Sequence, residues 1–123
     1  MISLYVAVGG ACGAVMRYWA ANAAGALVGR DFPYGTLLVN LLGSFLIGLA
    51  YVVLVERHES SNELRGLLIA GVLGGFTTFS AFSYETLALL ETAQPTRAIV
   101  NVLGSIIGCI VACWLGTLSA RQF

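Results

Sequence analysis

The sequence of 123 residues has few charges, no lysine and a single histidine. Only 10% of its residues are charged, whereas soluble domains average about 25%. Its longest polar stretch, residues 56–63, is a tight turn, so the chain has no room for a soluble enzyme domain. It also lacks a phosphate-binding loop, and nothing in its composition suggests a nucleic-acid partner. With 59% hydrophobic residues, the chain is instead predicted to be a membrane protein in contact with the lipid bilayer.

No basic residue precedes the first apolar run, so the N-terminus lacks the charged region of a cleaved signal peptide. We interpret this run as the first membrane helix. The three cysteines (Cys12, Cys109 and Cys113) lie in apolar stretches, away from His58. They are interpreted as small buried hydrophobic residues rather than metal ligands or disulfide partners.

Four apolar stretches follow one another along the chain, each long enough for the roughly 20 residues that cross a bilayer. They cover residues 2–28, 34–55, 65–93 and 96–119. The predicted fold class is an all-α membrane protein with four transmembrane helices per subunit. Residues 1–123 then form a single domain.

The arginines are divided almost equally between the two ends of these helices, so the positive-inside rule favours neither orientation. One end carries Arg57, Arg65 and Arg121, and the other carries Arg17, Arg30 and Arg97. We therefore expect dual topology and an antiparallel homodimer. Small residues at four-residue spacing permit close helix contacts, either in this dimer or within one subunit: Gly9/Gly13, Ser44/Gly48, Gly71/Gly75 and Gly104/Gly108.

Polar side chains form lines along three of the predicted helices. The lines are Thr36, Asn40 and Ser44; Ser80, Ser83 and Glu85; and Asn101, Ser105, Cys109 and Cys113. Polar groups inside a membrane mark a substrate or ion route, or else they hold helices together by hydrogen bonds. Asn40 and Glu85 favour a route, because amides and carboxylates are costly in hydrocarbon. The serines and threonines taken alone favour helix contacts.

The stretch "GGFTTFSAFSYE", residues 74–85, interrupts the third helix with two glycines and several hydroxyl residues. We expect a break near residues 74–78, where freed carbonyls are suited to a small cation. Phe79 and Phe82 then share one face, and their positively polarised ring edges are suited to weak contact with an anion. The alternative is that the rings only pack. Arg17, in the first helix, is placed in a vestibule that attracts anions, or extends to the headgroups.

Together with "GTLLVNLLGS" and "GAVMRY", this stretch resembles the Fluc (CrcB) family of small fluoride channels over the whole chain. The resemblance implies an antiparallel dimer with two fluoride pores and a central sodium ion, held by the carbonyls of Gly74 and Thr77 from both subunits. It implies that Phe79, Phe82 and Asn40 line the pore and that Arg17 belongs to the vestibule. Ser80, Ser83 and Glu85 would form a polar track beside the phenylalanines.

Two positions depart from the family pattern. Ala81 stands where a hydroxyl residue is usual, and Cys109 stands where a serine is expected. The resemblance implies passive fluoride export through the cell inner (plasma) membrane by a multi-pass protein, and therefore protection from fluoride rather than enzymatic activity.

Two other functions are compatible with a small four-helix membrane protein. A proton-coupled exporter of the small multidrug-resistance type has similar length and topology, but it relies on a glutamate in its first helix. The first helix here has no acidic residue and contains Arg17. A purely structural membrane protein would leave the broken, polar third helix without an explanation.

Overall fold

The computed structural model describes the whole chain and consists of helices without any strand. The helical elements are α1 (Ile2–Val28), α2 (Tyr34–Tyr51), η1 (Val52–Glu56), α3 (Asn62–Arg65), η2 (Gly66–Leu73), α4 (Gly74–Phe76), α5 (Phe79–Glu91) and α6 (Pro95–Arg121). The two η elements are π-helical and continue the neighbouring α-helices. The chain thus forms four long helical segments, and the third is interrupted between α4 and α5.

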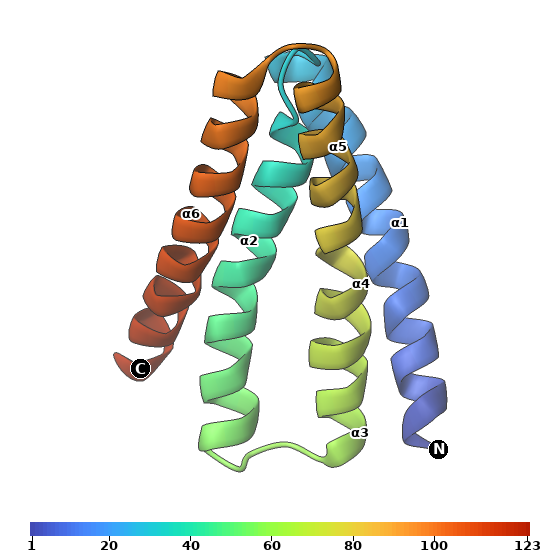
Figure 1. Cartoon of the computed structure of the whole chain (residues 1–123). Helices are drawn as coiled ribbons and strands as arrows, with labels where there is room; N and C mark the ends of the chain where they lie inside the picture. The colour runs from blue at the N-terminus through green and yellow to red at the C-terminus, as the bar shows by residue number, and fades with distance from the viewer.

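The four segments run up and down, so that both termini and the turn after η1 lie at one end of the molecule (Figure 1). The segments spread apart toward that end and meet at the other, where short loops join α1 to α2 and α5 to α6. This places Arg57, Arg65 and Arg121 at the end of the termini, as predicted.

Three segments are long and apolar enough to cross a membrane: Tyr34–Glu56, Asn62–Glu91 and Pro95–Arg121. The all-helical membrane fold is therefore confirmed. The 27-residue α1 is not among these three spans; it contains Arg17 and many glycines and alanines. The prediction that α1 also crosses the membrane stays a prediction.

Several helices begin or end at residues that commonly cap or terminate helices. Gly29 ends α1 with a φ of 117°, a conformation that glycine adopts without strain. The Ser61 hydroxyl accepts a hydrogen bond from the Leu64 N–H and caps α3. Pro95 occupies the first turn of α6, where its missing N–H costs nothing. At the other end of α6, Arg121 pairs with Glu56 at 2.8 Å and ties α6 to η1.

Close backbone contacts hold α1 against η2 and α4. A Cβ atom on Gly75 would meet the backbone of Gly10 and Ala14, so only glycine permits this approach. Three of the four small-residue pairs predicted from the sequence contribute to such contacts within the subunit. In the fourth pair, Gly104 has open space around its Cβ position.

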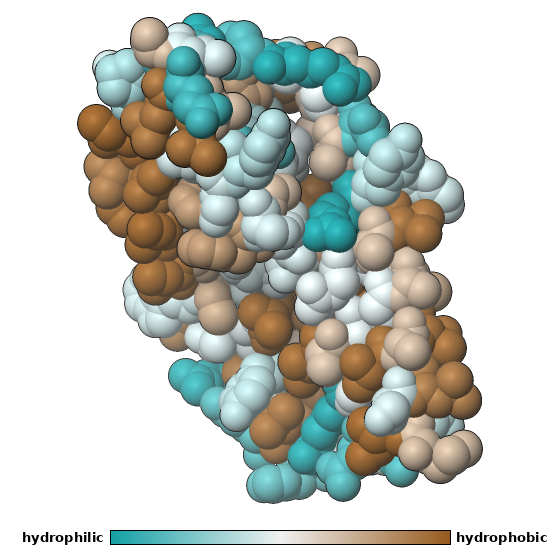
Figure 2. Space-filling view, turned by 45° about the vertical axis from the view of Figure 1, so that its right-hand side comes forward, coloured by the Kyte–Doolittle hydropathy of each residue, from teal (hydrophilic) through white to brown (hydrophobic).

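The surface between the two ends is mainly apolar. Figure 2 shows hydrophilic residues at the top and bottom and hydrophobic ones over much of the area between them. Only 17 of 123 residues are buried within the subunit, and many of its large hydrophobic side chains are exposed. Such a surface requires lipid or another subunit to cover it. Cys12 is exposed, and Cys109 and Cys113 are half-buried within the subunit, which corrects the expectation that the three cysteines are buried.

Candidate functional site

The third helical segment is interrupted at Thr77 and Thr78, within the predicted range 74–78. Both residues are extended, with φ/ψ of −82°/157° at Thr77 and −152°/121° at Thr78. The Asn40 side chain holds them in place from α2: its Nδ2 donates to the Thr78 carbonyl at 2.9 Å, and its Oδ1 accepts from the Thr78 N–H at 2.8 Å. An amide therefore replaces the helical partners of Thr78.

The residues next to the break also stabilise it, by hydrogen bonds and by leaving space for it. The Thr78 hydroxyl accepts a hydrogen bond from the Ala81 N–H and caps the start of α5. The Thr77 hydroxyl donates to the Leu73 carbonyl at 3.0 Å. A Cβ atom on Gly43 would overlap the Thr77 methyl group, so α2 needs a glycine opposite the break. Thus α2 supplies both the amide that secures the break and the space that admits it.

The break leaves two carbonyl groups without their helical donors. The Thr78 N–H, which an unbroken helix would direct at the Gly74 carbonyl, bonds instead to Asn40 Oδ1, whereas the Thr77 N–H keeps its helical acceptor, the Leu73 carbonyl. The Thr77 carbonyl accepts no backbone hydrogen bond, because the Ala81 N–H bonds to the Thr78 hydroxyl. Unpaired carbonyl oxygens are hard ligands of the kind that coordinate Na⁺ in membrane proteins. Gly74 and Thr77 therefore fit the predicted sodium site.

A cavity of about 410 Å³, which we call the groove cavity, lies beside the break between α2, α5 and α6. Its lining includes Asn40, Ser44, Thr78, Phe79, Phe82, Ser105 and Cys109. The structure thus brings together three predicted pore residues, Asn40, Phe79 and Phe82, and adds hydroxyl and thiol groups from α6.

The two phenylalanine rings contact one another, as their spacing predicts. Their centroids are 5.3 Å apart and their planes are inclined by 49°. Phe82 is buried, whereas 76% of Phe79 is exposed in the single subunit. A ring this exposed in a membrane protein has to be covered by lipid or by another protein chain.

Glu85 lies outside the groove cavity, in a second cavity of about 390 Å³ that we call the Arg17 cavity. Arg17, Thr36, Thr78 and Ala81 also line it. The Thr36 hydroxyl donates to Glu85 Oε1 at 2.8 Å, and Glu85 Oε2 is buried without a partner. Arg17 is half-buried and forms no ion pair. Cation and carboxylate thus share one cavity without neutralising each other directly.

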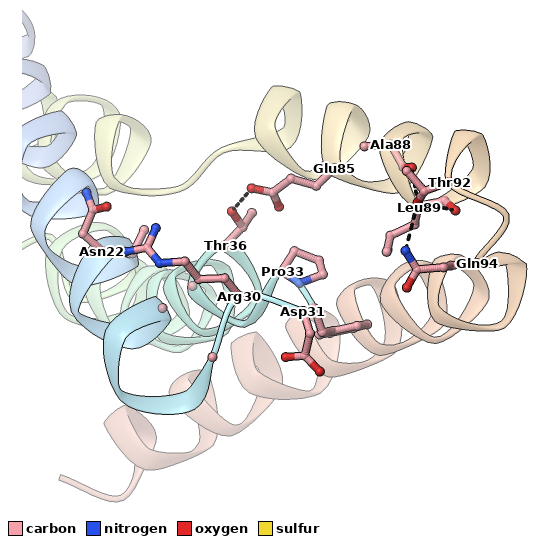
Figure 3. Close-up of a pocket in the computed structure, with 15 residues that line it drawn as sticks. Asn22, Arg30, Asp31, Pro33, Thr36, Glu85, Ala88, Leu89, Thr92 and Gln94 are labelled. Carbon is pink, nitrogen blue, oxygen red and sulfur yellow. Dashed lines mark hydrogen bonds between the residues drawn. The ribbon is translucent and has the colours of Figure 1, made fainter.

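A third cavity of about 460 Å³, the Arg30 cavity, lies near the end where the segments meet (Figure 3). Thr36 and Glu85 line both this cavity and the Arg17 cavity, and Thr78 lines both the Arg17 cavity and the groove cavity. The Arg30 cavity therefore adjoins the Arg17 cavity, and the Arg17 cavity adjoins the groove cavity, so that the three extend from the loop end of the molecule to the break.

Ser80 and Ser83 line none of the three cavities. Both are exposed; the Ser80 hydroxyl is 3.2 Å from that of Thr78, and the Ser83 hydroxyl donates to the Phe79 carbonyl at 3.0 Å. These serines therefore lie outside the cavities that Asn40 and Glu85 line. Their role beside the phenylalanines stays a prediction about the assembled protein.

Sequence reasoning missed the cavity position of Arg30 and left the role of Asn101 open between two alternatives. Arg30 was considered only for topology, yet it lines the largest of the three cavities and has no acidic partner, since the neighbouring Asp31 pairs with Arg97 at 3.7 Å. Asn101 donates to the Thr86 hydroxyl at 2.9 Å and joins α6 to α5. An arginine beside Gly29, where the first helix ends, was the available signal for Arg30. Asn101 belongs to the polar line predicted along the fourth helix, and its bond to Thr86 is the helix contact that was one of the two roles expected of that line.

The fold and the cavities define an all-helical membrane protein whose helices carry polar and aromatic groups that line cavities between them. The family model described as "CrcB-like protein, Camphor Resistance (CrcB)" matches residues 4–117. The chain therefore belongs to the CrcB family. With three candidate spans, it is a multi-pass protein of the inner (plasma) membrane.

Its curated relatives carry the name fluoride-specific ion channel FluC. The protein of Geobacter sulfurreducens is 51% identical over 119 residues, which cover 97% of this chain and 96% of that one. The protein of Hydrogenovibrio crunogenus is 46% identical over 118 residues, covering 96% and 89% of the two chains. The protein of Methylococcus capsulatus is 45% identical over 122 residues; this chain is covered to 98% but spans only 54% of that relative.

Proposed function

We propose that the chain is a subunit of a fluoride-selective ion channel, which exports fluoride passively and protects the cell from it. The observation that carries the proposal is the groove cavity: a pair of phenylalanine rings and an amide meet at a helix break, in a chain 51% identical to a fluoride channel. No enzymatic reaction is required. The comparisons lend no support to a proton-coupled exporter.

The series of cavities suggests how an anion reaches the break. Arg30 and Arg17 line successive cavities and carry charges without acidic partners, so they raise the local concentration of anions. The Glu85 carboxylate lines both cavities and opposes tight anion binding there. A pathway needs attraction strong enough for entry and weak enough for release.

At the break, the groove cavity supplies the donors that must replace the water around fluoride. Asn40 uses one Nδ2 hydrogen for the Thr78 carbonyl, and its second hydrogen remains free. The Phe79 and Phe82 ring edges add weak positive potential, and α5 begins beside them with the positive end of its dipole. Such contacts select a small anion by fit without holding it tightly.

We further propose that four segments, including α1, span the membrane and that two subunits assemble in opposite orientations. The balanced arginines and the exposed Phe79 ring support this arrangement, because an oppositely inserted copy can cover the ring. A protease-cleavable tag at the C-terminus tests it in right-side-out vesicles. External protease should cleave about half of the tags; cleavage of all or none would contradict dual topology.

The same assembly would contain sodium at the subunit interface, held by the carbonyls of Gly74 and Thr77 from both subunits. These groups lack helical donors and suit a hard monovalent cation. When bound, sodium would supply a fixed positive charge at the interface. The Asn40 side chain holds the break in the conformation that frees these carbonyls, and Gly43, which has no side chain, leaves space for it.

Fluoride efflux from proteoliposomes tests the function. Purified protein is reconstituted in liposomes loaded with potassium fluoride, and external fluoride is followed with an ion-selective electrode after valinomycin is added. A channel predicts rapid release that depends on the potassium ionophore and not on a proton gradient. Release that requires a proton gradient would favour the exporter, and no release in either condition would contradict both.

A further inference from the structure

The groove cavity contains one side chain that can form a covalent bond, the thiol of Cys109. Cys109 is half-buried, forms no disulfide and lines the groove cavity together with Phe79 and Phe82. It is the only cysteine that lines any of the three cavities. Cys12 is exposed on α1, and Cys113 follows Cys109 by one turn of α6. A reactive group is therefore placed where the proposed pathway is lined by aromatic rings.

An independent observation shows that this part of α6 faces a space suited to a guest molecule. Ser105 precedes Cys109 by one helical turn and lines the same cavity. Ser105 is only 8% exposed, and its hydroxyl has no hydrogen-bond partner within the chain. A buried hydroxyl without a partner is costly, so a polar guest beside it is favourable. Cys109 shares that wall.

We propose that Cys109 is a thiol modification site inside the ion pathway, and that a small thiol-reactive molecule closes the channel by forming a mixed disulfide there. This inference rests on the proposed channel function. The probe is methyl methanethiosulfonate, which is small and uncharged. The Cys109 thiol loses its proton to water and its sulfur attacks the thiomethyl sulfur; the new S–S bond forms as the bond to the sulfonyl group breaks, and methanesulfinate leaves.

The modification changes the groove in two ways. It replaces the weak S–H donor by an apolar thiomethyl group, and it places that group in the cavity lined by both rings. Fluoride then meets a narrower passage with fewer donors. We expect modification of Cys109 to lower fluoride flux at least about tenfold.

The experiment compares flux before and after treatment in proteoliposomes of the full chain, and peptide mass spectrometry records which cysteines carry a thiomethyl group. Three variants serve as controls: Cys109→Ser, Cys12→Ser and Cys113→Ser. The ratio of treated to untreated flux should stay near one for C109S, whatever its own rate. C12S and C113S should lose flux as the unaltered chain does, and dithiothreitol should restore it.

Two results would overturn the inference while leaving the channel itself intact. One is full flux after mass spectrometry shows Cys109 completely modified. The other is an unmodified Cys109 in a conducting protein whose Cys12 has reacted, because Cys109 would then not be reachable from the pathway. A protein that carries no fluoride before treatment would instead contradict the proposed function.

Discussion

The two halves of the interrupted third segment differ in what they contact. Residues 62–76 pack along α1 through glycines, and their π-helical part, η2, is composed of apolar residues and glycine. Residues 79–91, which form α5, contact α2 and α6 far less extensively and carry Phe79, Phe82 and Glu85 toward the cavities. The first half holds the fold together, and the second half lines the proposed pathway.

This difference depends on the connection between the halves. If the helix continued without a break, α5 would keep the direction of α4, and the Thr78 backbone would be satisfied within the helix. Asn40 instead binds both backbone groups of Thr78, so α5 begins anew with its own cap. One amide from α2 thus allows a single segment to serve packing and ion passage.

The largest effect is expected from Asn40→Asp. The carboxylate can still accept from the Thr78 N–H, but it cannot donate to the Thr78 carbonyl, and it places negative charge in the groove cavity. Fluoride flux in proteoliposomes should fall about a hundredfold, because like charge disfavours the anion. Asn62→Asp, at the start of the first half, is the matched control and should conduct normally. Normal flux in N40D would show that the amide does not meet the ion.

Gly75→Ala tests the packing half. The added methyl group would meet the Gly10 carbonyl and force α1 away from α4. We expect a loss of about 1–3 kcal/mol of stability, measured by thermal unfolding in detergent. Gly104→Ala adds the same methyl group in open space inside a helix and should not lower the unfolding temperature. Equal unfolding temperatures for the two variants would refute the close α1 contact.

Replacement of either ring, Phe79→Ile or Phe82→Ile, tests the pathway half. Isoleucine retains an apolar side chain but removes the polarised ring edge. Flux should fall about tenfold, while gel filtration should show an unchanged assembly. Phe76→Leu changes a buried aromatic residue of the first half, outside the groove cavity, and should alter flux little. If F79I and F82I conduct as well as F76L, the rings have no part in the pathway.

The smallest effect is expected from Arg30→Gln, at the outer end of the cavity series. Loss of an unpaired surface cation should lower fluoride flux roughly threefold at low ionic strength and hardly at high ionic strength. Arg30→Lys retains the charge and should conduct normally in both conditions. A salt-independent loss in R30Q would point to structural damage rather than to electrostatic attraction.

Much of the fold was predictable because hydrophobic length determines membrane helices. The predicted stretches 34–55 and 96–119 correspond closely to the observed Tyr34–Glu56 and Pro95–Arg121. The break was expected from its glycines and threonines, but the two glycines remain helical, and the interruption occurs at Thr77 and Thr78. Its exact place depends on Asn40, 38 residues away along the chain, which local propensity does not reveal.

The site was predictable only in part. The spacing of Phe79 and Phe82 correctly placed their rings together. It did not separate Glu85 from the groove cavity, because the orientation of α5 depends on the cap at Thr78 and on the Thr36 contact with Glu85. The Arg30 cavity was missed since it forms where two loops meet, and hydrophobic periodicity carries no information about loops.

The proposed channel requires that the groove cavity passes the smallest halide and rejects larger ones. Its most direct test is the ratio of fluoride to chloride flux, measured with ion-selective electrodes on one preparation of proteoliposomes under the same potassium gradient. The proposal predicts rapid fluoride release with chloride release near that of liposomes without protein. Chloride release as fast as fluoride release would contradict it.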